Sequence, residues 1–406
     1  MAFLYGLLFT LYSLFFMIPL NIFTASKFMT LTLLGLGIGL LALLYYFGVV
    51  AKKPILTYKV TPLNRALVST IKALNNPYFA TPWLFNNHFQ LIVLGFIKGF
   101  AKPLKYDRED VLTMKDKGQV GVDWYGLDLP EDTPTMLVLH TISGNPQSMR
   151  GFVRYVREHL GWRVALCVRR GHGDMSLNTA NFNTMGNTDD FAAQIQHIQS
   201  CFPISDLYAT GISAGSGVLA HYLGKQGYDT PIKAAVAYCP AYDMRNAFTR
   251  AVPFYSKMMT KKLHKLFITP NHEKFQNFES LGELQAAENL HEFHQHLYEI
   301  AGNDSCEDYM LNSNPSEVFD DIKIPILILN AKDDPVCHIE NVYQHLPRIE
   351  AMENVILVLT ERGSHCAYFE GLTAKPWANR LISEYFSAFQ SIQKSDEWKT
   401  MAQKVG

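Results

Sequence analysis

The stretch Leu207 to Gly217, which reads Leu-Tyr-Ala-Thr-Gly-Ile-Ser-Ala-Gly-Ser-Gly, decides the fold. Its first four residues are typical of a buried β-strand, and Gly217 to Gln226 has the pattern of an amphipathic helix. A Gly-x-Ser-x-Gly motif at such a junction predicts a sharp turn, because its two glycines carry no Cβ atom that would clash there. We expect this turn to raise the Ser213 hydroxyl above the sheet as a nucleophile. The alternative interpretation is a glycine-rich turn capped by serine.

Similar short apolar runs alternate with amphipathic segments along the chain. The predicted strands are Met136–Leu139, Val164–Val168, Leu207–Thr210, Ala234–Cys239, Ile326–Leu329 and Val355–Leu359. The predicted helices lie near 148–160, 189–198, 217–226, 340–346 and 376–393. This succession predicts an α/β fold with a mostly parallel, doubly wound sheet. Residues 110–114 and 120–125 predict a hairpin at the sheet edge, and the long interval between Cys239 and Ile326 predicts a helical cap inserted at the carboxyl edge.

A nucleophilic serine needs a base and an acid, and both residue types follow later predicted strands. Asp333 and Asp334 come after Ile326–Leu329, and His365 comes after Val355–Leu359. Because the carboxyl ends of parallel strands meet at one edge, we expect His365 to accept the proton of Ser213 and an aspartate to orient the imidazole. We choose Asp334 because Pro335 turns the chain directly after it, with Asp333 as the alternative. A surface loop histidine is the other interpretation of His365.

The tetrahedral intermediate of such a reaction needs two backbone N–H donors for its oxyanion. One is expected from Ala214, directly after the nucleophile, and the other from the loop after Met136–Leu139. Within that loop we predict the Ile142 amide, with Thr141 as the second choice.

Composition excludes several classes of protein. The 406 residues contain 36 Lys+Arg and 37 Asp+Glu, a balance that argues against binding nucleic acid by phosphate neutralisation. A hydrophobic content of 48% is too high for a disordered chain. The six cysteines are scattered singly, so a zinc ribbon or a disulfide scaffold is disfavoured.

The first 50 residues contain a single charged side chain, Lys27. Phe28 to Val50 is long enough to span a bilayer, and we predict that it does. Ala2 to Phe23 is read as a second span, an interfacial helix or a cleaved signal peptide. Lys52, Lys53, Lys59 and Arg65 follow the second run, which favours a cytosolic catalytic part. The N-glycosylation sequon Asn303-Asp304-Ser305 favours the opposite side of the membrane for the catalytic part, so the orientation stays open.

These patterns divide the chain into five intervals. They are a membrane anchor of one or two helices (1–54), a linker with a helical segment (55–102), a first core part (103–242), a cap (243–320) and a second core part (321–406).

Two further segments suggest roles outside the triad, namely metal binding and contact with lipid. His291 to His296 contains several histidines, but the metalloprotease pattern needs histidine where Gln295 stands, so we read the segment as a polar helix face and expect no metal. Val252 to Ile268 alternates bulky apolar residues with lysines. It is either a lid that touches lipid or an ordinary amphipathic cap helix.

Several motifs resemble those of a known family, the membrane-anchored branch of the α/β-hydrolase superfamily that contains lipid esterases, medium-chain phospholipases and ethanol acyltransferases. The motifs are Thr81–Gln90 (Thr-Pro-Trp-Leu-Phe-Asn-Asn-His-Phe-Gln), Arg169–Gly173, Asn187–Asp189, the turn at Ser213, Asn330–Pro335, Gly363–His365 and Phe369–Gly371. The chain departs from the family in three places. It has Ser364 where the family has glycine, Asn87-His88-Phe89-Gln90-Leu91 where the family has Gly-His-x-Gln-Thr, and Thr141-Ile142-Ser143-Gly144 in the oxyanion loop.

The resemblance implies a triad of Ser213, one aspartate of the Asp333–Asp334 pair and His365, and it implies no cofactor. It also implies hydrolysis of a lipid acyl ester, such as a phospholipid or acylglycerol, at the endoplasmic reticulum or another internal membrane. Two alternatives stay open: an acyltransferase that passes the acyl group to an alcohol, and an inactive lipid-binding module.

Overall fold

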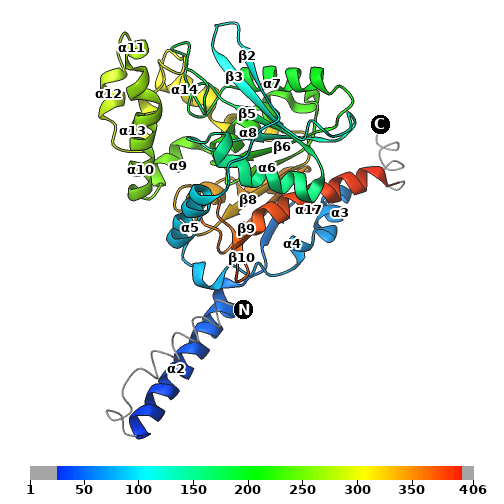
Figure 1. The fold of residues 1–406 in the computed structure, drawn as a ribbon, viewed down its shortest axis with the longest axis vertical. Coiled ribbons are helices and arrows are strands. Elements are labelled where there is room, and N and C mark those ends of the chain that lie inside the picture. The colour runs from blue at the N-terminus through cyan, green and yellow to red at the C-terminus, as the bar shows by residue number, and fades with distance from the viewer. Residues whose placement is uncertain (1–24, 396–406) are drawn as a thin grey trace.

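A nine-stranded sheet forms the centre of the computed structural model, which describes residues 25–395 (Figure 1). Its strand order is β1-β9-β8-β7-β6-β4-β5-β3-β2. The strands are β1 (Ile55–Tyr58), β2 (Arg108–Thr113), β3 (Gln119–Tyr125), β4 (Thr135–Leu139), β5 (Arg163–Val168), β6 (Leu207–Ile212), β7 (Ile232–Tyr238), β8 (Ile326–Ala331) and β9 (Val355–Thr360). Strands β4 to β9 pair in parallel, while β1, β2 and β3 pair antiparallel at the two edges. The predicted α/β class and edge hairpin are therefore confirmed.

Helices cover both faces of the sheet, as the continuous apolar strands require. One face packs against α3 (Pro62–Thr70), α4 (Lys72–Asn75), α6 (Pro146–Leu160) and α17 (Trp377–Lys394). The other packs against α7 (Thr188–Cys201), α8 (Ala214–Gln226), α15 (Ile339–Tyr343) and α16 (Leu346–Ala351). Each face thus has its own buried apolar cluster, with the sheet between them.

The parallel register brings three loops to one edge of the sheet. Ile212 is level with Tyr238 in the β6–β7 pair, and Asn330 is level with Leu359 in the β8–β9 pair. The segments that follow β6, β8 and β9 therefore leave the sheet on the same side. This edge is where open α/β sheets hold their ligands.

Two local predictions differ from the structure. Residues 55–58, expected in a linker, form β1 and pair with β9 from Ile55↔Leu359 to Tyr58↔Ile356. The single helix expected near 340–346 is divided into α15 and α16, the second of which has Pro347 in its first turn. A proline cannot donate the backbone hydrogen bond that would continue the first helix.

Residues between β7 and β8 form a group of helices at one side of the sheet (Figure 1). They are α9 (Met244–Arg250), α10 (Pro253–Leu263), α11 (His272–Phe275), α12 (Leu281–Ala286), α13 (Leu290–Gln295) and α14 (Cys306–Ser313). Their buried residues make a third apolar cluster that also includes Ile142 and Ala214. We call this group the cap, and it packs directly on the loops at the carboxyl edge.

The helix α2 (Ala25–Tyr45) extends away from the body, as Figure 1 shows. Together with the π-helical turn Tyr46–Val50 it provides a stretch, Met29–Val50, with a mean hydropathy of 2.2. Its 22 residues are long enough and apolar enough to cross a membrane. The first apolar run, Ala2 to Phe23, lies outside the described residues.

Candidate active site

The turn at Ser213 has the strained geometry that its glycines permit. Strand β6 ends at Ile212, α8 begins at Ala214, and Ser213 between them has a φ of 55°. A Cβ atom on Gly211 would lie 2.4 Å from the Gly215 oxygen, and one on Gly215 would lie 2.3 Å from the Leu139 oxygen. Glycine at both positions lets the backbone fold tightly enough to present Ser213 at the amino end of α8.

Ser213, His365 and Asp334 form a continuous hydrogen-bonded chain. Ser213 Oγ lies 2.8 Å from His365 Nε2, and His365 Nδ1 lies 2.8 Å from Asp334 Oδ2. With the Nδ1 proton facing the carboxylate, the serine hydroxyl donates to Nε2. This arrangement allows the imidazole to take the proton of Ser213 during nucleophilic attack.

The two neighbouring aspartates have separate partners. Asp334 is buried, and its Oδ1 accepts hydrogen bonds from the Val336 and Cys337 amides at 2.8 and 2.9 Å. Asp333 instead accepts from the Ser364 amide at 2.8 Å, and burial raises its pKa to about 7. Asp334 is thus placed against the histidine, while Asp333 is bonded to the loop that carries it.

Opposing effects act on the pKa of His365. Burial lowers it, since the charged imidazolium is poorly solvated, but the carboxylate of Asp334 outweighs this effect. The pKa is therefore held well above the ordinary value of 6.5. The same carboxylate would stabilise the imidazolium that forms when Ser213 gives up its proton.

Asn87, at the start of α5 (Asn87–Phe100), joins the loops that carry the acid and the base. Its Nδ2 donates to the Asp333 main-chain oxygen at 2.7 Å, and its own oxygen accepts from Ser364 Oγ at 2.9 Å. The sequence places Asn87 in the motif Thr81–Gln90 but indicates no role for it. Its position at the start of a helix, far along the chain from either loop, gave no local signal of these contacts.

The carbonyl groups of the oxyanion loop are held by Arg169 and by the buried His172. The Thr141 oxygen accepts from Arg169 Nη2 at 2.6 Å and from the Gly144 amide at 2.9 Å. The Ile142 oxygen lies 2.9 Å from His172 Nε2. Because a trans peptide points its N–H opposite to its C=O, fixing the Thr141 carbonyl also fixes the Ile142 N–H.

The two main-chain amides predicted to bind the oxyanion make no hydrogen bond within the described part of the chain. The Ile142 and Ala214 nitrogens donate to no acceptor among residues 25–395. Ala214 is the first residue of α8, where helical N–H groups lack an intrahelical acceptor and the helix dipole favours negative charge. Within these residues both N–H groups are without an acceptor, as the predicted oxyanion hole requires.

The histidine segment 291–296 differs from its prediction as a polar helix face. It lies on α13, where Phe293 and His294 are buried in the cap. His294 Nε2 lies 2.9 Å from Thr184 Oγ1, and its Nδ1 lies 2.7 Å from the Leu290 oxygen. Burial lowers its pKa to about 4, so this histidine serves as a neutral core residue.

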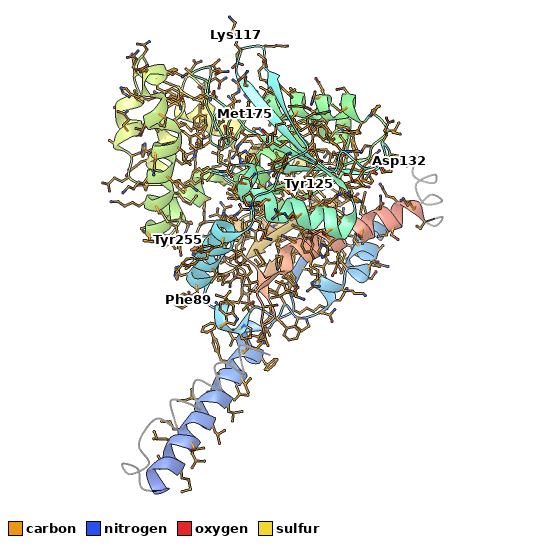
Figure 2. All side chains as sticks on the ribbon, viewed as in Figure 1. Phe89, Lys117, Tyr125, Asp132, Met175 and Tyr255 are labelled. Atoms are coloured by element: carbon orange, nitrogen blue, oxygen red, sulfur yellow. The ribbon has the colours of Figure 1, made fainter. Side chains whose placement is uncertain are left out.

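The segment 252–268 forms α10 and a π-helical turn, His264–Ile268, and it is amphipathic. Tyr255 and Leu263 are buried, while Phe254 and Met258 are exposed. Tyr255 Oη lies 2.7 Å from His88 Nδ1, which joins α10 to α5. Figure 2 labels Tyr255 of α10 and Phe89 of α5 on the same side of the molecule. The cap and α5 therefore border the same side of the site.

Comparison with known proteins gives consistent results. Phospholipase ABHD3 from Bos taurus is 26% identical over 391 residues, covering 90% of this chain and 91% of its own. Embryogenesis-associated protein EMB8 from Picea glauca is 26% identical over 355 residues, covering 81% and 76%. Monoacylglycerol lipase ABHD2 from Homo sapiens is 25% identical over 364 residues, covering 82% and 85%.

A family model, Hydrolase_4, described as serine aminopeptidase, S33, matches residues 135–371. The matched range runs from β4 past β9, and it includes the turn at Ser213 and the loops of Asp334 and His365. Since the match spans more than half of the chain, the protein belongs to the Hydrolase_4 family of α/β hydrolases.

Proposed function

We propose that this protein is a membrane-anchored serine hydrolase that cleaves carboxylic esters of lipids through an acyl-enzyme on Ser213. The observation that carries the proposal is the hydrogen-bonded chain from Ser213 Oγ through His365 to Asp334, with both distances 2.8 Å. Three residues remote in sequence meet in the geometry that activates a hydroxyl group.

In this mechanism Ser213 Oγ attacks the ester carbonyl carbon as His365 Nε2 takes its proton. The Ala214 and Ile142 amides stabilise the oxyanion, and Asp334 stabilises the imidazolium. His365 then returns the proton to the departing alcohol, which leaves the acyl group on Ser213. A water molecule, deprotonated by His365, releases the acid and restores the serine.

The class of substrate rests on the relatives. Two of them are named as a phospholipase and a monoacylglycerol lipase, and the chain matches each over more than four fifths of their lengths. Phospholipids and acylglycerols share a carboxylic ester between an acyl chain and a glycerol oxygen. We therefore propose an ester of this type as the substrate.

Membrane anchoring through Met29–Val50 is part of the proposal, with Lys52 and Lys53 favouring a cytosolic catalytic part on an internal membrane such as the endoplasmic reticulum. The outer side of α5 supports it. Phe89, Phe96 and Phe100 are 58%, 59% and 84% exposed. Exposed aromatic side chains on one helix are typical of a surface that rests on lipid.

A fluorophosphonate probe tests the proposed chemistry. We expect the full-length protein in detergent to be labelled covalently at Ser213 and Ser213→Ala to be unlabelled. Ser216→Ala is the matched control, since Ser216 also stands between glycines, and it should remain labelled. Absence of labelling in the folded wild-type protein would contradict the enzymatic proposal and favour a lipid-binding module.

Product analysis separates hydrolysis from acyl transfer, which share the same acyl-enzyme. The protein is given a lipid ester in ¹⁸O-labelled water together with a deuterated alcohol. We expect ¹⁸O in the released acid. A deuterated ester as the main product would assign acyl transfer instead.

A further inference from the structure

A pocket of about 200 Å³ lies between α5 and α6, close to the triad. Leu94 and Ile97 of α5 form one wall, and Phe152 of α6 contributes to the other. Its inner end is formed by Ile212, Tyr238 and Cys366. Apolar side chains predominate among these residues, so the pocket suits a hydrocarbon group.

The inner end of this pocket is lined by two residues that are next to triad members in the chain. Ile212 directly precedes Ser213, and Cys366 directly follows His365. The sulfur atoms of Cys366 and Cys239 and a ring nitrogen of His365 all lie within 4.8 Å of one another. A group that is bound between α5 and α6 and touches Cys366 therefore ends near the His365 ring.

We propose that this pocket binds the acyl chain of the ester whose carbonyl group is attacked by Ser213. The inference rests on the proposed function and adds to it the residues that recognise the chain. A chain placed here is covered by Leu94, Ile97 and Phe152, and its carboxyl end lies toward Ser213. The pocket is smaller than the roughly 300–1,000 Å³ of sites that enclose drug-sized ligands, so it limits the length of chain that is accepted.

Polar contacts hold the wall in place. Arg150 of α6 donates from Nη2 to the Ala101 oxygen at 2.9 Å and to the Lys98 oxygen, which satisfies the last carbonyl groups of α5. Gln147 exchanges two hydrogen bonds with the Leu104 main chain, at 3.0 and 2.8 Å. These contacts fix the carboxyl end of α5, and the hydrogen bonds of Asn87 fix its amino end. A wall held in this way cannot widen easily, which is what selection by chain length requires.

The side of α5 that does not line the pocket carries an exposed apolar surface. Phe96 and Phe100, on the outer side of α5, are stacked with ring centroids 6.2 Å apart. With this side resting on lipid, as proposed above, α5 is the element that separates the bilayer from the pocket. This placement distinguishes the pocket from the other cavities described between residues 25 and 395, which have polar or open linings away from Ser213.

Chain-length selectivity tests the proposal. Gly151 of α6 borders the pocket, and a Cβ atom there would meet no heavy atom within 4 Å, so Gly151→Phe adds a ring without a clash at its base. We expect the ratio of kcat/KM for an octanoyl ester to that for an acetyl ester to fall about ten-fold or more. Each methylene group that no longer fits the pocket weakens the binding of the transition state for the longer ester. Leu94→Trp narrows the opposite wall and should act in the same direction.

Gly282→Phe is the matched control. Gly282 is also helical, with no heavy atom within 4 Å of a built Cβ, but it lies on α12 of the cap and not at this pocket. The ratio of kcat/KM for the octanoyl ester to that for the acetyl ester should be the same in Gly282→Phe as in the wild type. Unchanged ratios in both Gly151→Phe and Leu94→Trp would overturn the proposal, as would an equal change in Gly282→Phe.

Alkylation of Cys366 gives a readout that does not depend on catalysis. Cys366 is partly exposed and borders the pocket, whereas Cys306 is partly exposed on α14. Octanoate should slow the reaction of Cys366 with iodoacetamide about five-fold or more, while acetate should not, and Cys306 should be unaffected by either. Protection that is equal for both acids, or absent for both, would overturn the pocket assignment.

The two readouts separate this inference from the proposed function. Protection of Cys366 by octanoate in a protein that neither hydrolyses esters nor reacts with a fluorophosphonate would support the pocket and contradict the proposed catalysis. Ester hydrolysis without protection and without any change in selectivity would support the catalysis and overturn the pocket.

Discussion

Asn87 donates a hydrogen bond to the main-chain oxygen of Asp333 at 2.7 Å, although the two residues are 246 positions apart in the chain. The main-chain oxygen of Asn87 accepts from Ser364 Oγ, so one residue at the start of α5 contacts both loops that bring Asp334 and His365 together. Asn87 is therefore a positioning residue for the proposed triad.

Asn87→Ala should lower kcat about ten-fold with little change in KM, because the hydrogen bond that positions the acid loop is lost. The free energy of unfolding should fall by about 1 kcal/mol. Steady-state kinetics and chemical denaturation measure the two effects. Asn86→Ala is the control, since Asn86 caps the same helix through the His88 and Phe89 amides and does not contact Asp333. Equal loss of kcat in both variants would assign the effect to α5 and not to the loop contact.

The pH dependence of kcat/KM should follow His365. Only the neutral imidazole accepts the proton of Ser213, and Asp334 holds the pKa of His365 above the ordinary 6.5. Activity should therefore rise with pH through a midpoint above 6.5. In Asp334→Asn the midpoint should move to lower pH, and kcat should fall by about 10⁴-fold, as in serine proteases that lose this carboxylate. A midpoint that does not move would show that another group controls the profile.

Asp333 should make folding stability depend on pH. Its pKa in the folded state is about 7, whereas an unfolded chain has an ordinary value near 3.8. Between these values the folded state binds the extra proton, so this residue's contribution to stability decreases as pH rises from about 4 to about 7. Asp333→Asn removes that contribution.

The stability of Asp333→Asn relative to the wild type should therefore increase over the same pH range, and thermal denaturation at several pH values measures it. A relative stability that stays constant from about pH 4 to about pH 7 would mean that the carboxyl group is ionised in the folded protein throughout.

Two glycines should respond to alanine in opposite ways. Gly215→Ala places a Cβ atom 2.3 Å from the Leu139 oxygen, so the turn at Ser213 must shift. We expect the free energy of unfolding to fall by about 2 kcal/mol or more and most of the fluorophosphonate labelling to be lost. Gly151→Ala lies in the interior of α6 with open space around its Cβ, and it should stabilise the protein by about 0.5–1 kcal/mol. Chemical denaturation compares the two. Similar stability changes in both variants would contradict the close packing at Gly215.

Phe96→Glu combined with Phe100→Glu should weaken action on lipid vesicles. Both side chains are exposed on α5, so the charges are tolerated in the fold but oppose contact with a bilayer. We expect about a ten-fold loss of activity on vesicle-borne esters and little loss on a water-soluble ester. Tyr228→Glu is the control, since Tyr228 is 82% exposed and lies outside α5. Equal effects on the two substrates would contradict a lipid-facing role of α5.

The α/β class could be predicted from local patterns because buried parallel strands need continuous apolar runs. The runs at β4 to β9 are of this kind, and the structure confirms the alternation of strands and helices. β1 was not predicted, because a strand of four residues at a sheet edge is determined by its partner β9 and has little pattern of its own. The burial of His294 likewise depends on Thr184, which lies far away in the chain.

The sequence by itself determined the turn at Ser213, since glycine at 211 and 215 is a local requirement of that backbone, and it determined the apolar stretch that ends at Val50. Only the tertiary structure decided which of two adjacent carboxylates faces His365, because Asp333 and Asp334 have the same chemistry and differ in direction alone. It also decided that Asn87 holds both loops and that a pocket opens between α5 and α6. These contacts join segments that are distant along the chain, and packing of the sheet and its helices is what brings them within hydrogen-bonding distance.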